Sequence, residues 1–186
     1  MRDPRRVAVL ISGRGSNMRA LVEKASGYDI VLVASNKPAA EGLAWARQRG
    51  LSTWSSDSRA QTREGFDRQV SAILDDHDVG TIALAGFMRI LSPWFVEQWR
   101  GRILNIHPSL LPRYPGLDTH ARALAAGDAV AGCSVHVVTE ELDAGEVLGQ
   151  AEVPVLPGDT PQSLEDRVLA AEHALYARVL SEFVNR

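Results

Sequence analysis

The sequence predicts an α/β fold, in which one mostly parallel sheet is flanked by helices. Two patterns along its 186 residues support this prediction. Short apolar runs without polar alternation, such as residues 7–11 and 81–84, are typical of strands buried on both faces of a parallel sheet. Between these runs lie segments whose apolar residues recur every three or four positions, as on one face of a helix. Sheets of this kind bind ligands beyond the carboxyl ends of their strands.

The expected elements alternate regularly through the first half of the chain. We expect strands at residues 7–11, 29–35, 81–84 and 103–106, and helices that begin near residue 17, cover 41–49 and carry the apolar face Phe66, Val70, Ile73 and Leu74. Such a face packs against a sheet. The alternation is typical of a doubly wound sheet.

The second half begins with a stiff loop. Three prolines within residues 108–115 exclude a regular helix there, because proline lacks a backbone N–H and restricts the residue before it. Two further strands are expected at 134–138 and 147–155, joined by an acidic turn, and a long helix is expected from Pro161. No linker or repeat interrupts the pattern, so residues 1–186 are predicted to form a single domain.

Composition limits the class of partner. The formal charge of −3 gives no general reason to expect nucleic acid or an anionic membrane. No apolar stretch approaches the roughly 18 residues of a membrane-spanning helix. The lone Cys133 excludes an intramolecular disulfide, and no residue spacing is typical of a metal site. We therefore expect a cytoplasmic protein without a metal.

A glycine-rich loop, residues 12–17, follows the first strand and precedes a helix. Free backbone N–H groups and the helix dipole favour a phosphate at such a place. The loop lacks the Gly-Lys-Ser/Thr of a P-loop, and Met18 stands where the dinucleotide-binding pattern needs its third glycine. A monophosphate is the better match. The alternative is a tight structural turn in which Ser16 or Asn17 caps the helix, and the residues alone leave both open.

Asn105 and His107 are the candidates for chemistry. They lie two residues apart at the end of an expected strand, so their side chains should point to the same side near the sheet's carboxyl edge. An amide beside an imidazole can donate to the oxyanion that develops when a carbonyl is attacked, which suits acyl or formyl transfer. Asp143, in the acidic turn, could reach the imidazole and stabilise its charged form. A structural histidine is the alternative, and His136 is a weaker site candidate.

Longer motifs resemble a known family. Residues 105–112, with the sequence Asn-Ile-His-Pro-Ser-Leu-Leu-Pro, resemble the folate-dependent formyltransferases, as do residues 85–93 and 114–116. The first motif is shared by several members, so it indicates the chemistry better than the acceptor. Three other segments are similar to the members that formylate glycinamide ribonucleotide: residues 11–17, 34–37 and 134–145.

The resemblance implies a fold and an activity. Residues 1 to about 100 would form a Rossmann-like half that binds the nucleotide phosphate, and residues from about 101 to 186 would continue the same mixed sheet and complete the catalytic and folate sites. The implied reaction moves the formyl group of 10-formyltetrahydrofolate, a co-substrate, to the amine of 5'-phosphoribosylglycinamide. Its products are N-formyl glycinamide ribonucleotide and tetrahydrofolate, in purine (IMP) biosynthesis. The implied catalytic residues are Asn105, His107 and Asp143, with no covalent intermediate.

The resemblance also implies two ligand sites. In the ribonucleotide site, the phosphate would lie against Gly15, Ser16 and Asn17, and the ribose hydroxyls against Glu172. The folate site would be larger and formed by several segments. Its implied residues are Arg63, Met88, Arg89, Ile90, Leu91, Asn105, Thr139, Glu140, Glu141, Leu142 and Asp143.

Other functions remain open at the level of sequence. Hydrolysis of 10-formyltetrahydrofolate would replace the amine by water, but such relatives usually carry an N-terminal regulatory domain, which we do not expect here. Formylation of methionyl-tRNA would call for a basic RNA-binding domain, which the acidic balance disfavours. A non-catalytic nucleotide-binding module would keep only the glycine loop. The expected partners are small molecules, and the oligomeric state, a homodimer included, is left open.

Overall fold

The computed structural model describes residues 2–186. The strands are β1 (Arg6–Ile11), β2 (Asp29–Ser35), β3 (Thr53–Ser55), β4 (Thr81–Leu84), β5 (Ile103–His107), β6 (Val130–Val137) and β7 (Val147–Pro154). The helices are α1 (Ser16–Glu23), α2 (Glu41–Gln48), α3 (Arg63–Asp76), α4 (Pro93–Gln98), α5 (Thr119–Ala125) and α6 (Pro161–Val184).

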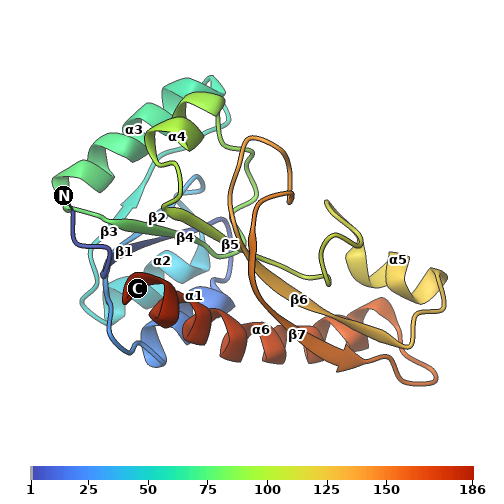
Figure 1. Cartoon of the computed structure of the whole chain (residues 1–186). Coiled ribbons are helices and arrows are strands. Elements are labelled where there is room, and N and C mark those ends of the chain that lie inside the picture. Colours follow the sequence, from blue (N-terminus) through green and yellow to red (C-terminus); the bar gives the residue numbers. More distant parts are fainter. Residues whose placement is uncertain (1) are drawn as a thin grey trace.

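Within this described part of the chain, seven strands form one sheet in the order β3-β2-β1-β4-β5-β6-β7. Strands β1 to β5 run parallel, β6 runs antiparallel to β5, and β7 runs antiparallel to β6. Figure 1 shows α1, α2 and α6 on one side of the sheet and α3 and α4 on the other. The predicted α/β class with a mostly parallel, mixed sheet is confirmed.

The central strands are buried on both faces, which explains their continuous apolar runs. In β1, Val7, Val9 and Ile11 belong to the apolar core shared with α1, α2 and α6. Ala8 and Leu10 point the other way, into the core shared with α3 and α4. A parallel strand with helices on both sides has no face for polar residues.

Most predicted elements are confirmed to within one or two residues, with two notable differences. β5 includes His107, which the sequence placed just beyond the strand, and β6 begins at Val130, four residues before the predicted start. Gly132 interrupts the strand pattern of the sequence, because glycine is unfavourable inside a strand, so the first residues of β6 were not predicted. The structure requires glycine there, because a Cβ atom would overlap the carbonyl oxygen of Ala151 on β7.

Three short elements, β3, α4 and α5, were not predicted. α4 carries a recognisable start signal, since Ser92 caps the helix through its hydroxyl and Pro93 follows. α5 carries no such signal: its N-cap residue Asp118 has a φ of 58° and makes no side-chain cap. Short elements without caps or apolar periodicity depend on their tertiary contacts.

α6 covers the sheet along its length and begins with a capping box between Thr160 and Ser163. Its predicted apolar stripe packs into the core, with Ala171 and Phe183 half-buried at the edge and four members buried: Leu164, Val168, Leu175 and Val179. No helix within residues 2–186 is both long and apolar enough to span a membrane.

Tyr176 ties α6 to the centre of the sheet, which gives a test of the fold. Its hydroxyl is buried and lies 3.0 Å from the carbonyl oxygen of Leu84 and 3.1 Å from that of Leu104. Tyr176→Phe keeps the ring and removes this donor from two buried carbonyl groups. We expect the free energy of unfolding to fall by about 1–2 kcal/mol in urea denaturation. An unchanged unfolding midpoint would show that the hydroxyl does not hold β4 and β5 to α6.

Candidate active site

A polar cluster occupies one face of β5. Asn105 and His107 lie two residues apart on this strand and therefore point to the same side of the sheet. The antiparallel register with β6 places His136 opposite Asn105 and Ser134 opposite His107. Both histidines are almost fully buried, with 5% of His107 and 2% of His136 exposed. The site is therefore polar but largely shielded from bulk water.

The ring of His107 is held on both sides. Its Nε2 lies 2.9 Å from the carbonyl oxygen of Tyr114, which can only accept a hydrogen bond, so Nε2 carries a proton. Its Nδ1 faces Asp143 and lies 3.4 Å from Oδ2 of that carboxylate. The His107 atom that remains for a substrate is therefore Nδ1, beside Asp143.

Asp143 is fixed by several contacts. Its backbone has a φ of 52°, in the left-handed region, and its Oδ2 accepts the N–H of Gly116 at 2.9 Å. Its Oδ1 lies 3.6 Å from Nε2 of His136. Burial by itself raises the pKa of Asp143, but the interactions with His136, the Gly116 N–H and the His107 ring together lower that pKa below its usual value. The side chain is thus a buried carboxylate at neutral pH.

His136 is a member of the cluster that the sequence ranked too low. Its Nδ1 lies 3.1 Å from the carbonyl oxygen of Val137, so Nδ1 carries the proton in this arrangement. Its Nε2 faces both Nδ2 of Asn105, at 3.2 Å, and Oδ1 of Asp143. In the neutral ring this Nε2 accepts a hydrogen bond from Asn105, which orients the amide and leaves its second N–H for a ligand. A proton on Nε2 would instead be shared with Asp143. The sequence placed His136 on a strand, but only the cross-strand register shows what it faces.

The loop after β5 is tied to the sheet by polar side chains. The Ser134 hydroxyl donates to the carbonyl oxygen of Ser109 at 2.7 Å and accepts the N–H of Leu111 at 3.0 Å. The Gln150 amide on β7 donates to the carbonyl oxygen of Leu111 at 2.9 Å. The two antiparallel strands therefore hold the irregular loop in place beside His107.

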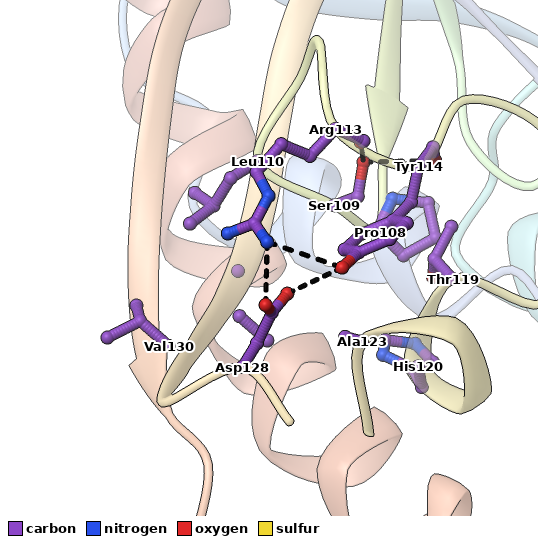
Figure 2. A pocket seen from close by; sticks show the side chains of 12 residues that line it. Pro108, Ser109, Leu110, Arg113, Tyr114, Thr119, His120, Ala123, Asp128 and Val130 are labelled. Atoms are coloured by element: carbon purple, nitrogen blue, oxygen red, sulfur yellow. Dashed lines mark hydrogen bonds and ion pairs between the residues drawn. The ribbon is translucent and has the colours of Figure 1, made fainter. Parts of the chain in front are cut away.

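The outer side of the same loop borders a small cavity against α5 (Figure 2). Arg113 and Tyr114 point from the loop toward Asp128, whose carboxylate accepts from the guanidinium at 2.6 Å and from the phenol at 2.8 Å. Thr119 and His120 line the cavity from α5. These contacts fix the side chain of Tyr114 while its carbonyl group faces His107.

The glycine-rich loop leads directly into α1. Gly15 occupies the N-cap position with a φ of 72°, and a side chain there would be strained and would approach Met18 closely. No side chain among residues 2–186 caps the first turn, so the alternative in which Ser16 or Asn17 caps α1 is wrong. The first N–H groups of α1 are thus left for a ligand at the carboxyl end of β1.

Asn17 and Glu172 meet from opposite ends of the chain. The amide of Asn17 donates to Oε2 of Glu172 at 2.7 Å, and both residues are buried. Within the part of the chain that the structure describes, Oδ1 of Asn17 has no hydrogen-bond partner. Burial raises the pKa of Glu172 to about 6, although the bond from Asn17 acts in the opposite direction. The structure therefore brings Asn17, a candidate for phosphate binding, into contact with Glu172, the candidate for ribose binding.

One segment of the folate candidates follows β4. Met88 and Ile90 are large apolar residues that are 64% and 60% exposed, whereas Leu91 is buried in the core beneath α3 and α4. Arg89 bonds to the carbonyl oxygens of Ser58 and Thr62 and lies over the ring of Phe66. This segment therefore offers exposed apolar side chains on a backbone that is held to the start of α3.

The remaining folate candidates are more scattered. Arg63 is the exposed first residue of α3. Burial raises the pKa of Asp67 overall, although the positive charge of Arg63, like that of Arg89, acts to lower that pKa. No hydrogen bond or ion pair within residues 2–186 joins Arg63 or Leu142 to another folate candidate. Four exposed residues occupy the loop that leads to Asp143: Thr139, Glu140, Glu141 and Leu142.

The fold agrees with a match to a known protein family. Residues 5–180 match the formyl transferase family, so the chain belongs to that family. This match covers the whole sheet and the candidate catalytic residues.

Particular relatives narrow the class further. Phosphoribosylglycinamide formyltransferase of Escherichia coli is 48% identical over 184 residues, which are 96% of this chain and 87% of the relative. The crystal structure of phosphoribosylglycinamide formyltransferase from Brucella melitensis gives a TM-score of 0.92 at 48% identity and covers 100% of this chain and 97% of that one. Trifunctional purine biosynthetic protein adenosine-3 of Drosophila melanogaster is 48% identical over 97% of this chain, which spans 14% of that longer protein.

Glu172 makes stability depend on pH in a direction that can be tested. Because its pKa is raised from 4.5 to about 6 in the folded protein, the folded state binds this proton more tightly than the unfolded chain. Stability from this group is therefore present below pH 4.5 and is lost as the pH rises through 6. Glu172→Gln cannot ionise, so we expect its stability relative to the parent protein to increase by about 2 kcal/mol between pH 4 and pH 7.5. If urea denaturation gave the same stability difference between Glu172→Gln and the parent protein at all these pH values, the raised pKa of the buried Glu172 carboxyl would be contradicted.

Proposed function

We propose that this protein transfers the formyl group of 10-formyltetrahydrofolate to the amine of glycinamide ribonucleotide. The products are N-formyl glycinamide ribonucleotide and tetrahydrofolate, in purine biosynthesis. The observation that supports this most is the polar cluster of Asn105 and His107 on β5, His136 on β6 and Asp143 in the next loop, in which both histidines are buried. This cluster lies beside β4, the strand that precedes the proposed folate segment. The 48% identity to a phosphoribosylglycinamide formyltransferase over most of both chains supports the choice of acceptor.

The ribonucleotide is proposed to bind across α1 and α6. Its phosphate would accept hydrogen bonds from the uncapped first turn at Gly15, Ser16 and Asn17, where the helix dipole favours an anion. Its ribose hydroxyls would donate to Glu172, whose carboxyl already meets Asn17. The unpartnered Oδ1 of Asn17 supports this proposal, because a ribose hydroxyl could donate the hydrogen bond that this buried acceptor lacks.

The folate is proposed to bind over the segment after β4 and the loop before Asp143. Met88, Ile90 and Leu142 expose apolar surface that suits the flat faces of the rings of a folate, whose polar edges would need hydrogen-bonding partners. Arg63 lies at the exposed start of α3, where it would meet the charged tail of the folate. Arg89 contributes less directly, because its guanidinium is already bonded to backbone carbonyl groups.

The polar cluster has the groups that this reaction needs. 10-Formyltetrahydrofolate supplies the formyl carbon, to which the ribonucleotide's amine forms a C–N bond while the bond to the folate nitrogen breaks. The free N–H of Asn105 and a protonated Nδ1 of His107 would donate to the formyl oxygen as charge develops there. Asp143 would stabilise the charged His107 ring and assist the movement of the proton that leaves the amine toward the departing nitrogen. The carbonyl of Tyr114 keeps the ring oriented meanwhile.

The proposal extends to the protein's setting. Its ligands would be two small molecules rather than a nucleic acid or a membrane. We propose that it works in the cytoplasm and that a homodimer is compatible with its activity, since the proposed site is built within one chain.

An assay with and without the acceptor tests the proposed function. We expect purified protein to release tetrahydrofolate from 10-formyltetrahydrofolate only when glycinamide ribonucleotide is present, because the reaction needs the amine. The readout is the absorbance change of the folate, with formylated ribonucleotide identified by mass spectrometry. Release that is independent of the ribonucleotide would favour a hydrolase, and binding of the ribonucleotide without any release would favour a non-catalytic module.

A further inference from the structure

A second buried polar chain lies where β1, β2 and β3 end, apart from the catalytic cluster. It consists of Ser12, Asn36 and Ser58, which are 6%, 5% and 6% exposed. Each directly follows, or lies a few residues beyond, the end of a parallel strand. The reaction described above gives none of the three a role.

Ser12 holds the segment after β4 at two points. Its backbone N–H donates to the carbonyl oxygen of Gly86 at 3.1 Å, and its Oγ accepts the N–H of Met88 at 2.8 Å. The single hydroxyl proton goes to Oδ1 of Asn36 at 2.6 Å. Because that proton is committed to Asn36, a lone pair of Oγ is directed at Met88.

The chain continues from Asn36 to the next loop. Nδ2 of Asn36 lies 3.4 Å from Oγ of Ser58, and the carbonyl oxygen of Asn36 accepts the N–H of Ser58 at 3.3 Å. Arg89 in turn donates to the carbonyl oxygen of Ser58 at 3.4 Å. Consecutive residues Met88 and Arg89 are therefore held by the same polar chain.

Ser12 is also the first residue of the glycine-rich loop 12–17, which we call the phosphate loop because the phosphate is proposed to bind there. Gly13 follows it directly, and the carbonyl oxygen of Gly13 accepts the N–H of Gly42 on α2 at 3.1 Å. Met88 and Ile90 themselves are mostly exposed, so little side-chain packing fixes them. The position of Met88 therefore depends on hydrogen bonds to the backbone of this segment, such as that between its N–H and Ser12.

We propose that Ser12, oriented by Asn36, is a positioning residue that sets the folate-binding segment 88–91 from the base of the phosphate loop. The inference rests on the proposed function, because it assumes that this segment contacts folate. Removing the hydroxyl leaves the buried Oδ1 of Asn36 without its donor and the N–H of Met88 without its acceptor. The segment then loses the contact that fixes Met88, while Arg89 and Leu91 still anchor its other end, and folate binding must restore the lost order.

Ser12→Ala tests this, with Ser35→Ala as the matched control. Ser35 is also buried, at 1% exposed, and its hydroxyl accepts the N–H of Lys37 at 3.1 Å within its own turn. We expect the KM for 10-formyltetrahydrofolate to rise about tenfold in Ser12→Ala, as for loss of one buried hydrogen-bond partner. The kcat and the KM for the ribonucleotide should change by less than about twofold, within the error of such comparisons. Ser35→Ala should leave the folate KM unchanged.

Asn36→Ala provides a second test, of whether Asn36 acts through Ser12. If Asn36 acts by orienting the Ser12 hydroxyl, the Asn36→Ala and Ser12→Ala effects on folate KM should not add in the double variant. Thermal unfolding of Ser12→Ala and Ser35→Ala identifies any general loss of structure. An equal folate KM in Ser12→Ala and Ser35→Ala would overturn the proposal, as would a fall in kcat or an equal rise in the KM for both substrates.

Calorimetric titration with tetrahydrofolate separates this inference from the proposed function. A tenfold weaker Kd in Ser12→Ala than in Ser35→Ala would support positioning even if no formyl transfer were seen. A parent protein that binds no tetrahydrofolate would overturn both. A parent protein that binds it with the same Kd as Ser12→Ala would overturn the positioning role alone.

Discussion

The carboxylate of Asp143 holds together three segments that are far apart in the chain. Its Oδ2 accepts the N–H of Gly116 and lies 3.4 Å from His107, while its Oδ1 lies 3.6 Å from His136. These contacts join the loop after β5, the strand pair β5–β6 and the loop between β6 and β7. A buried carboxylate is costly unless it is paired or hydrogen-bonded. The partners that stabilise its charge are the groups that the proposed chemistry uses, so the site forms as one unit.

The sheet explains why these segments meet. Parallel strands β1 to β5 all end at the same edge, which gathers the phosphate loop, the folate segment and His107 there. The change of direction at β6 then brings a strand back across β5 and places His136 opposite Asn105. The proposed ribonucleotide site depends on the other face, where Asn17 on α1 meets Glu172 on α6. One sheet would therefore position both proposed substrates.

Much of this arrangement is predictable from the sequence, and the rest depends on contacts between distant residues. The apolar runs of β1, β2 and β4 predict their bounds, because burial on both faces leaves a continuous signal. The three-residue β3 and the uncapped α5 leave no comparable signal. Motifs indicate Asn105, His107 and Asp143, but the weight of His136 depends on the cross-strand register. The carbonyl of Tyr114 could not be inferred either, because the sequence shows a stiff loop but not which backbone groups it presents.

We propose that Asp143 serves catalysis through the two histidines and does not serve ribonucleotide binding. The most direct measurement is the kcat of Asp143→Asn beside its Kd for glycinamide ribonucleotide, with Asp128→Asn as a control carboxylate on the outer side of the same loop. We expect Asp143→Asn to lose turnover by about a hundredfold or more, while its ribonucleotide Kd stays within about twofold of the parent value. Near-normal turnover in Asp143→Asn, or an equal loss of ribonucleotide binding, would contradict it.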